Sequence, residues 1–403
     1  MNPSKSEIDW ELTGASNVAA QLSSKEKLKF LVKALAITTP RVLWSITYDV
    51  AFRPCEVLSR PFRMTLLKCA LQKVDLTIRE QRALWKPTGV CVANYCASKK
   101  LSHEKVLLAN TDAGTGGYNK ETNCGDEGRP TSSAYELRPA MLHFIGRGSK
   151  ARTTEKKVFI YFHGGGFFLP LTTGQLRFAD RAAREADANL VVLEYTLVPQ
   201  LKYPGQLAQG AAAVRYLLKT WHASDIIIAG DSAGANMCLS ILAHMREPHP
   251  LVEPIFPKGT PAEKLLGALV ISPRCANSNN SASFTYNNSR DIISGRSMDS
   301  VAEKWGTEME DVWAVPLQGG KEFWKDVMVN RMLLTAGENE VYVDDVKDFA
   351  AMMGAKDRIE QANCPYELVV SRGEFHVQAV LDVALAYNKG IMLEAVLDWL
   401  RAI

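Results

Sequence analysis

The sequence predicts an α/β protein with a mostly parallel central sheet and helices on both faces. Apolar runs rich in Val, Ile and Leu alternate with stretches of helical periodicity over most of the chain beyond residue 140. Strands that form continuous apolar runs are typical of sheets buried on both faces, and intervening helices supply that cover. The 403 residues are 47% hydrophobic and 23% charged, which is enough apolar material for a sizeable core.

The first 85 residues are predicted to be a helical segment without chemistry of their own. Residues 23–35 begin with Ser23 and Glu26 at the spacing of a capping box, and their apolar residues fall on one face. More helical material follows to about residue 84. We expect residues 1–85 to form an N-terminal helical segment and residues 86–403 to form the main domain.

The main domain is predicted to open with strands at 89–97 and 140–148, separated by an exposed loop at 110–133 that is rich in Gly, Asn, Thr and Ser. The apolar runs predicted as further strands are 157–163, 189–198, 225–230, 265–272, 331–337 and 366–372. The predicted helices between and after them include 174–187, 206–220, 234–246 and 390–403. Residues 274–328 interrupt the alternation as a polar insertion, with a helix predicted near 297–305.

Charge and cysteine content exclude several functional classes. The formal net charge is +3, both signs are mixed along the chain, and no basic run is dense enough to predict nucleic-acid binding. None of the eight cysteines forms a C-x-x-C pair or has zinc-ligand spacing with histidine. We therefore expect reduced thiols in an intracellular protein, without a metal site.

The N-terminal sequence lacks the basic and then apolar build of a secretory signal, so a cytoplasmic location is expected. The best membrane candidate is the stretch 30–52, but Lys33, Pro40, Arg41 and Asp49 argue against a spanning helix. A packed helix, a proline break and a second helix is the plainer interpretation. Peripheral contact of residues 30–52 with a membrane surface remains open.

A nucleophile motif follows one of the predicted strands. Residues 230–234 read Gly-Asp-Ser-Ala-Gly, a G-x-S-x-G pattern between a strand and a helix. A tight turn in this context presents a serine hydroxyl for attack, and the flanking Gly230 and Gly234 avoid clashes at the turn. The alternative is a serine that only caps an ordinary helix. The pattern favours Ser232 as a nucleophile, with Asp231 as part of the motif.

Three consecutive glycines end an earlier predicted strand in the stretch FIYFHGGGFF, residues 159–168. Glycines there allow backbone N–H groups to turn toward an oxyanion, and each such donor contributes about 2.7–4 kcal/mol. We predict that the amides of Gly164, Gly165 and Ala233 form this oxyanion hole, with Gly166 in the same motif and His163 in a structural role. A phosphate loop is disfavoured, since neither G-x-G-x-x-G nor a following G-K-[ST] is present.

The base and the acid are expected downstream of the serine, in the order serine, acid, histidine. Three histidines follow Ser232, of which His244 lies on the helix leaving the motif and His249 lies between two prolines. His376 follows the last predicted strand, on a loop where a base belongs. The order and position of His376 favour it as the base.

Five segments together resemble the hormone-sensitive-lipase-type branch of the α/β-hydrolase fold, also called the acetyl-esterase or α/β-hydrolase-3 group. They are HGGG at 163–166, EYTLVPQLKYPGQL at 194–207, GDSAG at 230–234, TAGENEVYVDD at 335–345 and GEFHV at 373–377. The resemblance covers about residues 140–403. The second segment departs from the family pattern Y-R-L-A-P by Thr196 and Val198, and the nucleophile motif reads GDSAGA where GDSAGG is commoner.

The most important departure from the family pattern concerns the acid of the triad. The family often reads D-P-L-x-D-E after its seventh strand, and residues 340–345 here read Glu-Val-Tyr-Val-Asp-Asp. Glu340 takes the place of the acid, and Asp344 is the second candidate. Either carboxylate could instead be a solvated loop residue.

The resemblance implies a serine carboxylesterase that needs no cofactor. It implies that the N-terminal segment 1–85 and the insertion 274–328 form a cap over the serine. It also implies a short acyl group, such as acetyl, on a larger apolar alcohol, as in the similar fungal steryl acetyl hydrolases and secondary-metabolite esterases. The expected partner is thus a small-molecule ester, and the oligomeric state is not predicted.

Two other functions remain open at this level. An acyltransferase or lyase could use the same serine with another acceptor. A small-molecule binding protein could use the same scaffold, as the plant gibberellin receptor does, but that lineage lacks the catalytic histidine that His376 supplies here.

Overall fold

The computed structural model describes residues 22–58, 61–73, 77–108, 139–146, 156–257, 259–277, 279–293, 305, 311–358, 360–361 and 364–403. The predicted loop at 110–133 and, apart from Trp305, the predicted helix at 297–305 lie outside these residues.

The described residues form one nine-stranded sheet in the order β1-β2-β4-β3-β5-β6-β7-β9-β8. The strands are β1 (Ser102–Leu108), β2 (Ala140–Gly146), β3 (Lys157–Phe162), β4 (Ala188–Glu194), β5 (Ile226–Asp231), β6 (Leu265–Ile271), β7 (Val329–Gly337), β8 (Lys356–Asp357) and β9 (Tyr366–Ser371). The pairs β1–β2 and β2–β4 are antiparallel, and every pair from β4 to β8 along the sheet is parallel. The predicted, mostly parallel sheet is confirmed.

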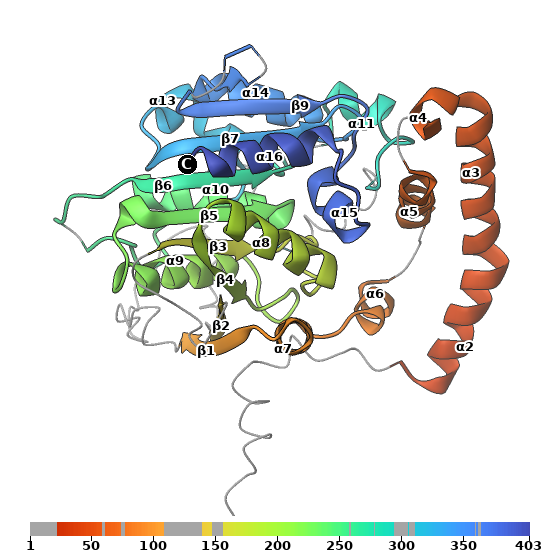
Figure 1. The fold of residues 1–403 in the computed structure, drawn as a ribbon, viewed down its shortest axis with the longest axis horizontal. Helices are drawn as coiled ribbons and strands as arrows, with labels where there is room; N and C mark the ends of the chain where they lie inside the picture. Colours follow the sequence, from red (N-terminus) through yellow and green to blue (C-terminus); the bar gives the residue numbers. More distant parts are fainter. Residues whose placement is uncertain are drawn as a thin grey trace, which may run out of the picture.

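Helices cover both faces of this sheet (Figure 1). The helices α9 (Gly205–Leu218), α10 (Ala233–Arg246) and α14 (Val343–Met353) belong to one buried apolar cluster. The helices α8 (Thr173–Glu185), α15 (Gln378–Ala384) and α16 (Ile391–Arg401) belong to a second cluster on the opposite face. Strands β3 and β5 contribute alternate side chains to the two clusters, as expected for strands buried on both faces.

The described part of the main domain also contains several short helical pieces. They are the 3₁₀ turns η3 (Ala223–Asp225) and η4 (Pro316–Gly319) and the helices α11 (Ala282–Tyr286) and α13 (Gly320–Trp324). Helix α11, the turn η4 and helix α13 lie in the predicted insertion, so the described residues toward both of its ends include helical pieces.

The prediction of a strand at 89–97 is wrong, because these residues lie in the helix α7 (Thr88–Lys99). Its buried residues are Thr88, Cys91, Val92, Tyr95 and Cys96. This spacing of three and four is that of one helix face, and the β-branched and aromatic residues hid it at the sequence level. Strand β1 at Ser102–Leu108, which the sequence reading passed over, takes the place next to β2.

The described part of the N-terminal segment, from residue 22 onward, is made of helices. It comprises α2 (Ser24–Lys33), the π-helical turn η2 (Ala34–Thr38), α3 (Thr39–Phe52), α4 (Pro54–Leu58), α5 (Phe62–Lys73) and α6 (Ile78–Leu84). The capping box of Ser23 and Glu26 is present at the start of α2. Figure 1 shows α2 and α3 as one long rod along the side of the molecule, with α5 and α6 toward the sheet.

Candidate active site

Ser232 lies in the sharp turn between β5 and α10. Its backbone has φ 53° and ψ −115°, a region that residues other than glycine rarely adopt. The turn is packed so closely that a Cβ on Gly234 would lie 1.8 Å from the carbonyl oxygen of Phe162, and one on Gly230 would lie 2.3 Å from the backbone of Gly234. The two glycines are therefore required by the geometry that projects the Ser232 hydroxyl.

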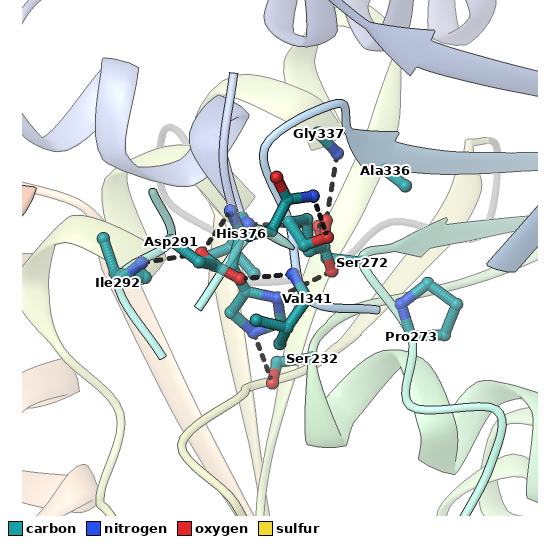
Figure 2. A network of polar contacts seen from close by, with 12 residues as sticks. Ser232, Ser272, Pro273, Asp291, Ile292, Ala336, Gly337, Val341 and His376 are labelled. Atoms are coloured by element: carbon teal, nitrogen blue, oxygen red, sulfur yellow. Dashed lines mark hydrogen bonds and ion pairs between the residues drawn. The ribbon is translucent and has the colours of Figure 1, made fainter. Parts of the chain in front are cut away.

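His376 and Glu340 come to this turn from two other strand ends. Glu340 follows β7 and His376 follows β9, and both side chains are buried. His376 Nε2 lies 2.9 Å from Ser232 Oγ (Figure 2), and His376 Nδ1 lies 2.8 Å from Glu340 Oε1. A carboxylate can only accept, so Nδ1 carries the proton and Nε2 is the acceptor that faces the hydroxyl. The structure thus brings together the three residues that the sequence placed in these roles.

The second oxygen of Glu340 is held by two donors that the sequence did not reveal. Glu340 Oε2 accepts hydrogen bonds from the Gly337 N–H and the Ser272 hydroxyl, both at 2.9 Å. Ser272 Oγ in turn accepts the N–H of Val377, next to the histidine, at 3.0 Å. Ser272 therefore connects the acid to the histidine loop.

Asp344, the other candidate acid, has different partners. Its oxygens accept the backbone N–H of Ser283 at 2.8 Å and the hydroxyl of Tyr286 at 3.0 Å. It lies in the first turn of α14, where a carboxylate is favoured by the helix dipole.

A further buried carboxylate, Asp291, was missed by the sequence reading. Its Oδ1 accepts the N–H groups of His376 at 3.0 Å and Ile292 at 2.7 Å, and its Oδ2 accepts that of Val341 at 2.8 Å. Figure 2 shows the Asp291 side chain between the loop that carries His376 and the loop that carries Val341. It joins the loop of the base to the loop of the acid, yet its surroundings in the polar insertion give it no distinguishing sequence pattern.

The charges around the histidine change its acidity. Burial by itself lowers the pKa of His376, but the Glu340 carboxylate, by its charge and its hydrogen bond, and the Asp291 carboxylate raise it, and the net direction is upward. Burial, with the nearby Glu340 charge, raises the pKa of Asp291 to about 7, against the lowering effect of His376 and of the amides that it accepts. The site thus stabilises an imidazolium at His376.

The first glycine of the triple-glycine turn has a fixed partner. The Gly164 N–H donates to Asp231 Oδ1 at 2.9 Å, and Asp231 also accepts from the Tyr161 hydroxyl and from Gln175 Nε2 at 3.0 Å. An amide has one hydrogen, so the prediction that Gly164 donates to an oxyanion is wrong. Its role is to tie the glycine turn to the nucleophile turn, where a Cβ would lie 2.4 Å from Asp231 Oδ2.

The amides of the next two glycines remain available. Gly165 and Gly166 have φ of +105° and +62°, which glycine adopts without strain. Within the described part of the chain, no hydrogen bond is made by the N–H of Gly165, Gly166 or Ala233.

His163 holds the glycine turn from behind. The Nδ1 atom of His163 lies 2.8 Å from the Gly164 carbonyl oxygen. The Tyr195 hydroxyl donates to the backbone carbonyl of His163 at 2.7 Å, and the rings of His163 and Tyr195 stack with their centroids 4.4 Å apart. Burial lowers the pKa of His163, which favours the neutral ring. These contacts agree with a structural role.

No helix among the described residues is long and apolar enough to cross a bilayer. Within the same residues, no group of three or more His, Cys, Asp or Glu is arranged to hold a metal ion.

A serine–histidine–acid arrangement at the strand ends of a mostly parallel sheet defines an α/β-hydrolase site. The chain belongs to the alpha/beta hydrolase fold family: the model of its α/β-hydrolase-3 group matches residues 159–379, more than half of the 403 residues. The resemblance drawn from the motifs is thereby confirmed.

Curated relatives and a solved structure agree with this assignment. The chain is 34% identical over 111 residues to steryl acetyl hydrolase 1 of Saccharomyces cerevisiae, covering 26% of this chain and 25% of that protein. It is 31% identical over 85 residues to versiconal hemiacetal acetate esterase of Aspergillus parasiticus, covering 21% and 27%. The chain thus spans about a quarter of the length of these relatives. The crystal structure of an esterase/lipase from an uncultured bacterium has the same fold, with a TM-score of 0.59 at 19% identity over 85% of this chain and 99% of that one.

Proposed function

We propose that the protein is a serine carboxylesterase in which Ser232 is the nucleophile, His376 the base and Glu340 the orienting acid. The observation that carries the proposal is the unbroken relay from Ser232 Oγ to His376 Nε2 at 2.9 Å and from His376 Nδ1 to Glu340 Oε1 at 2.8 Å. The relay begins at Ser232, whose backbone is held in a strained turn, as the nucleophiles of this fold are.

The reaction has two halves. Ser232 Oγ attacks the ester carbonyl carbon while its proton passes to His376 Nε2, and the imidazolium is stabilised by Glu340. The tetrahedral intermediate collapses when His376 returns this proton to the departing alcohol oxygen, which leaves an acyl group on Ser232. Water then repeats the sequence, with His376 taking the water proton and returning it to Ser232 as the acid leaves.

The oxyanion is assigned to the amides of Gly165, Gly166 and Ala233. The contact of Gly164 with Asp231 supports replacing the predicted pair Gly164 and Gly165 by Gly165 and Gly166. Ala233 follows the nucleophile at the start of α10, where the first N–H groups have no partner inside the helix. Each donor is worth about 2.7–4 kcal/mol to the transition state.

The substrate proposed is a short-chain ester, such as an acetate, of a larger apolar alcohol. Support comes from the names of the relatives, one a steryl acetyl hydrolase and the other a hemiacetal acetate esterase. The family fold alone does not fix a substrate, because the same triad serves many esters.

The N-terminal segment 1–85 and the insertion 274–328 are proposed to shape the substrate site as a cap. Arg82 of α6 donates from Nε to the Phe168 carbonyl at 2.7 Å and also reaches the Val198 carbonyl, beside the glycine turn. Arg53 Nη1 donates to the Ser289 carbonyl at 2.9 Å, two residues from Asp291. The segment thus contacts loops that carry site residues on two sides.

The test is a series of p-nitrophenyl esters from acetate to octanoate, assayed in water with and without an added alcohol. The expected result is hydrolysis that is fastest for the shortest chains, with Ser232→Ala inactive and the alcohol giving no ester product. If a new ester forms at the expense of the free acid, the reaction is acyl transfer and not hydrolysis. Saturable ligand binding without turnover would make the chain a binding protein.

A further inference from the structure

The long helical rod at the edge of the molecule, α2 to α3, carries its apolar residues on the outside. The side chains of Leu35, Trp44 and Phe52 are 71%, 72% and 72% exposed. Other exposed apolar residues of the rod are Leu28, Leu31, Val32, Ile37, Leu43, Tyr48 and Val50. Helix α2 has no buried residue at all, and the buried residues of α3 are Ser45 and Asp49.

The inner side of the rod is fixed by polar contacts, so the orientation is not that of an ordinary amphipathic helix packed on a core. Asp49 Oδ2 lies 2.5 Å from Lys68 Nζ of α5, and both side chains are buried. Asp49 Oδ1 lies 3.3 Å from Arg53 Nη1, which also holds the Ser289 carbonyl. A helix that packed its apolar face on the protein would have to expose this ion pair.

The charges of the rod suit an anionic surface. Residues 24–52 contain five cationic side chains (Lys25, Lys27, Lys29, Lys33, Arg41) and two acidic ones (Glu26, Asp49), so 5 − 2 gives a net charge of +3. Asp49 is paired internally, and Glu26 is engaged in the capping box and with Arg79 at 3.2 Å. The lysines gather at the start of the rod, and the aromatic residues Trp44, Tyr48 and Phe52 at its end.

We propose that the outward face of α2 to α3, defined by Leu28, Leu31, Val32, Leu35, Leu43, Trp44 and Val50, docks flat on an anionic lipid bilayer. Exposed leucines with tryptophan on one side and lysines beside them are the pattern of a helix that lies in the interface rather than across it. A second copy of this chain fits less well, since it would bring one +3 surface against another, whereas anionic headgroups complement that charge.

Docking would bring the esterase close to its substrate, and this step rests on the proposed function. Arg53, at the end of the rod, donates to the Ser289 carbonyl, and Gln72 of α5, the helix that pairs with the rod through Lys68, donates to the Asn288 carbonyl at 3.0 Å, next to the loop that carries Asp291. The catalytic site would therefore be held beside the bilayer, where esters of apolar alcohols accumulate.

The experiment is vesicle flotation of the full chain, with phosphatidylcholine vesicles and with vesicles containing 30% phosphatidylserine. We expect binding to the anionic vesicles that weakens with salt and is at least tenfold weaker to the neutral ones. The double variant Leu35→Glu/Trp44→Glu should lose binding by at least tenfold. Lys25→Gln/Lys29→Gln/Arg41→Gln should lose mainly the preference for anionic lipid.

The matched control is Ile391→Glu, which charges an exposed apolar side chain on α16, away from the rod. It should bind vesicles like the unchanged protein. Circular dichroism and p-nitrophenyl acetate turnover report folding, and vesicle binding is measured whether or not the protein hydrolyses esters. Absence of binding to anionic vesicles at low salt would overturn the proposal. So would self-association that Leu35→Glu/Trp44→Glu abolishes, since a second copy would then cover the face.

Discussion

Replacing Glu340 by glutamine tests the relay most sharply, because the contacts of Glu340 decide how the amide must turn. One oxygen of the carboxylate accepts from His376 Nδ1, and the other accepts from the Gly337 N–H and the Ser272 hydroxyl. A glutamine has one acceptor oxygen and one NH₂ group, so it cannot satisfy both sides.

The two orientations of the amide differ in free energy and in chemistry. If the NH₂ group faces Gly337, a buried N–H loses its acceptor, at a cost of about 1–3 kcal/mol. If it faces His376, Nδ1 must become the acceptor, the proton moves to Nε2, and Nε2 can no longer take the proton of Ser232. The second orientation is therefore favoured, and only about one molecule in 5 to 150 retains the active tautomer.

The lost countercharge adds to this effect. A hydrogen bond to a charged partner is worth about 1.5–3 kcal/mol, so the imidazolium in the transition state loses roughly a further ten- to hundredfold. We expect Glu340→Gln to lower kcat by at least about a hundredfold and by up to about ten thousandfold, the size of the same change in a serine protease.

The assay is the turnover of p-nitrophenyl acetate at saturating substrate, with circular dichroism to show that the variant is folded. The control is Asp344→Asn, whose partners are the Ser283 N–H and the Tyr286 hydroxyl, and we expect less than a tenfold loss. The reasoning fails if Glu340→Gln keeps more than a tenth of the activity, or if Asp344→Asn is the more damaging change.

Four more predictions concern the nucleophile, the base, Asp291 and the cap. Ser232→Ala should lower kcat by on the order of a millionfold in a folded protein, and near-normal turnover would refute the nucleophile. The acidic limb of kcat/KM should follow His376, since only the neutral ring accepts a proton, so activity falls as pH drops through its raised pKa. Asp291→Asn should move this limb to lower pH, because it removes a charge that raises the pKa of His376. It should also lower kcat roughly tenfold, because one backbone N–H loses its acceptor. If the limb did not move, Asp291 would have a purely structural role. Deleting residues 1–20 should be mild, while deletion through residue 50 should change chain-length preference, and an unaltered profile in a soluble truncated protein would contradict the cap.

Strands β2 to β7 and β9 could be predicted because each is a continuous apolar run whose signal is local, whereas β1 and the two-residue β8 have no such run. The predicted run at 225–230 corresponds to β5 at Ile226–Asp231, and that at 265–272 to β6 at Leu265–Ile271. Helix α7 could not be distinguished from a strand in the same way, because its buried face is a stripe of Thr, Cys, Val and Tyr rather than of leucines. The stripe has helical spacing, but its residue types favour strands.

Ser232, His376 and Glu340 could be located since each follows a recognisable strand, and in this fold the order of strand ends sets the order of functions. Asp291 and Ser272 could not, because their importance depends on contacts with residues far away in the chain. Ser272 meets Glu340 across 68 positions, and Asp291 meets His376 across 85. Neither has a local motif to mark it.

The role of Gly164 could not be predicted for the same reason, because it depends on a contact with a residue far away in the chain. This contact also shows what the variable residue of a G-x-S-x-G motif can do. The sequence presents three glycine amides as equivalent donors, and only the position of Asp231, 67 residues away, decides which one is already used. Asp231 also accepts from Tyr161 and Gln175, so it is locked from three sides and cannot release Gly164 without leaving a buried carboxylate short of donors. It follows that Asp231 sets the distance between the serine turn and the glycine turn, while Asp291 does the same for the loops of His376 and Glu340. Two carboxylates outside the relay thus hold its parts in register by accepting backbone N–H groups, and Asp291 in addition raises the pKa of His376 through its charge.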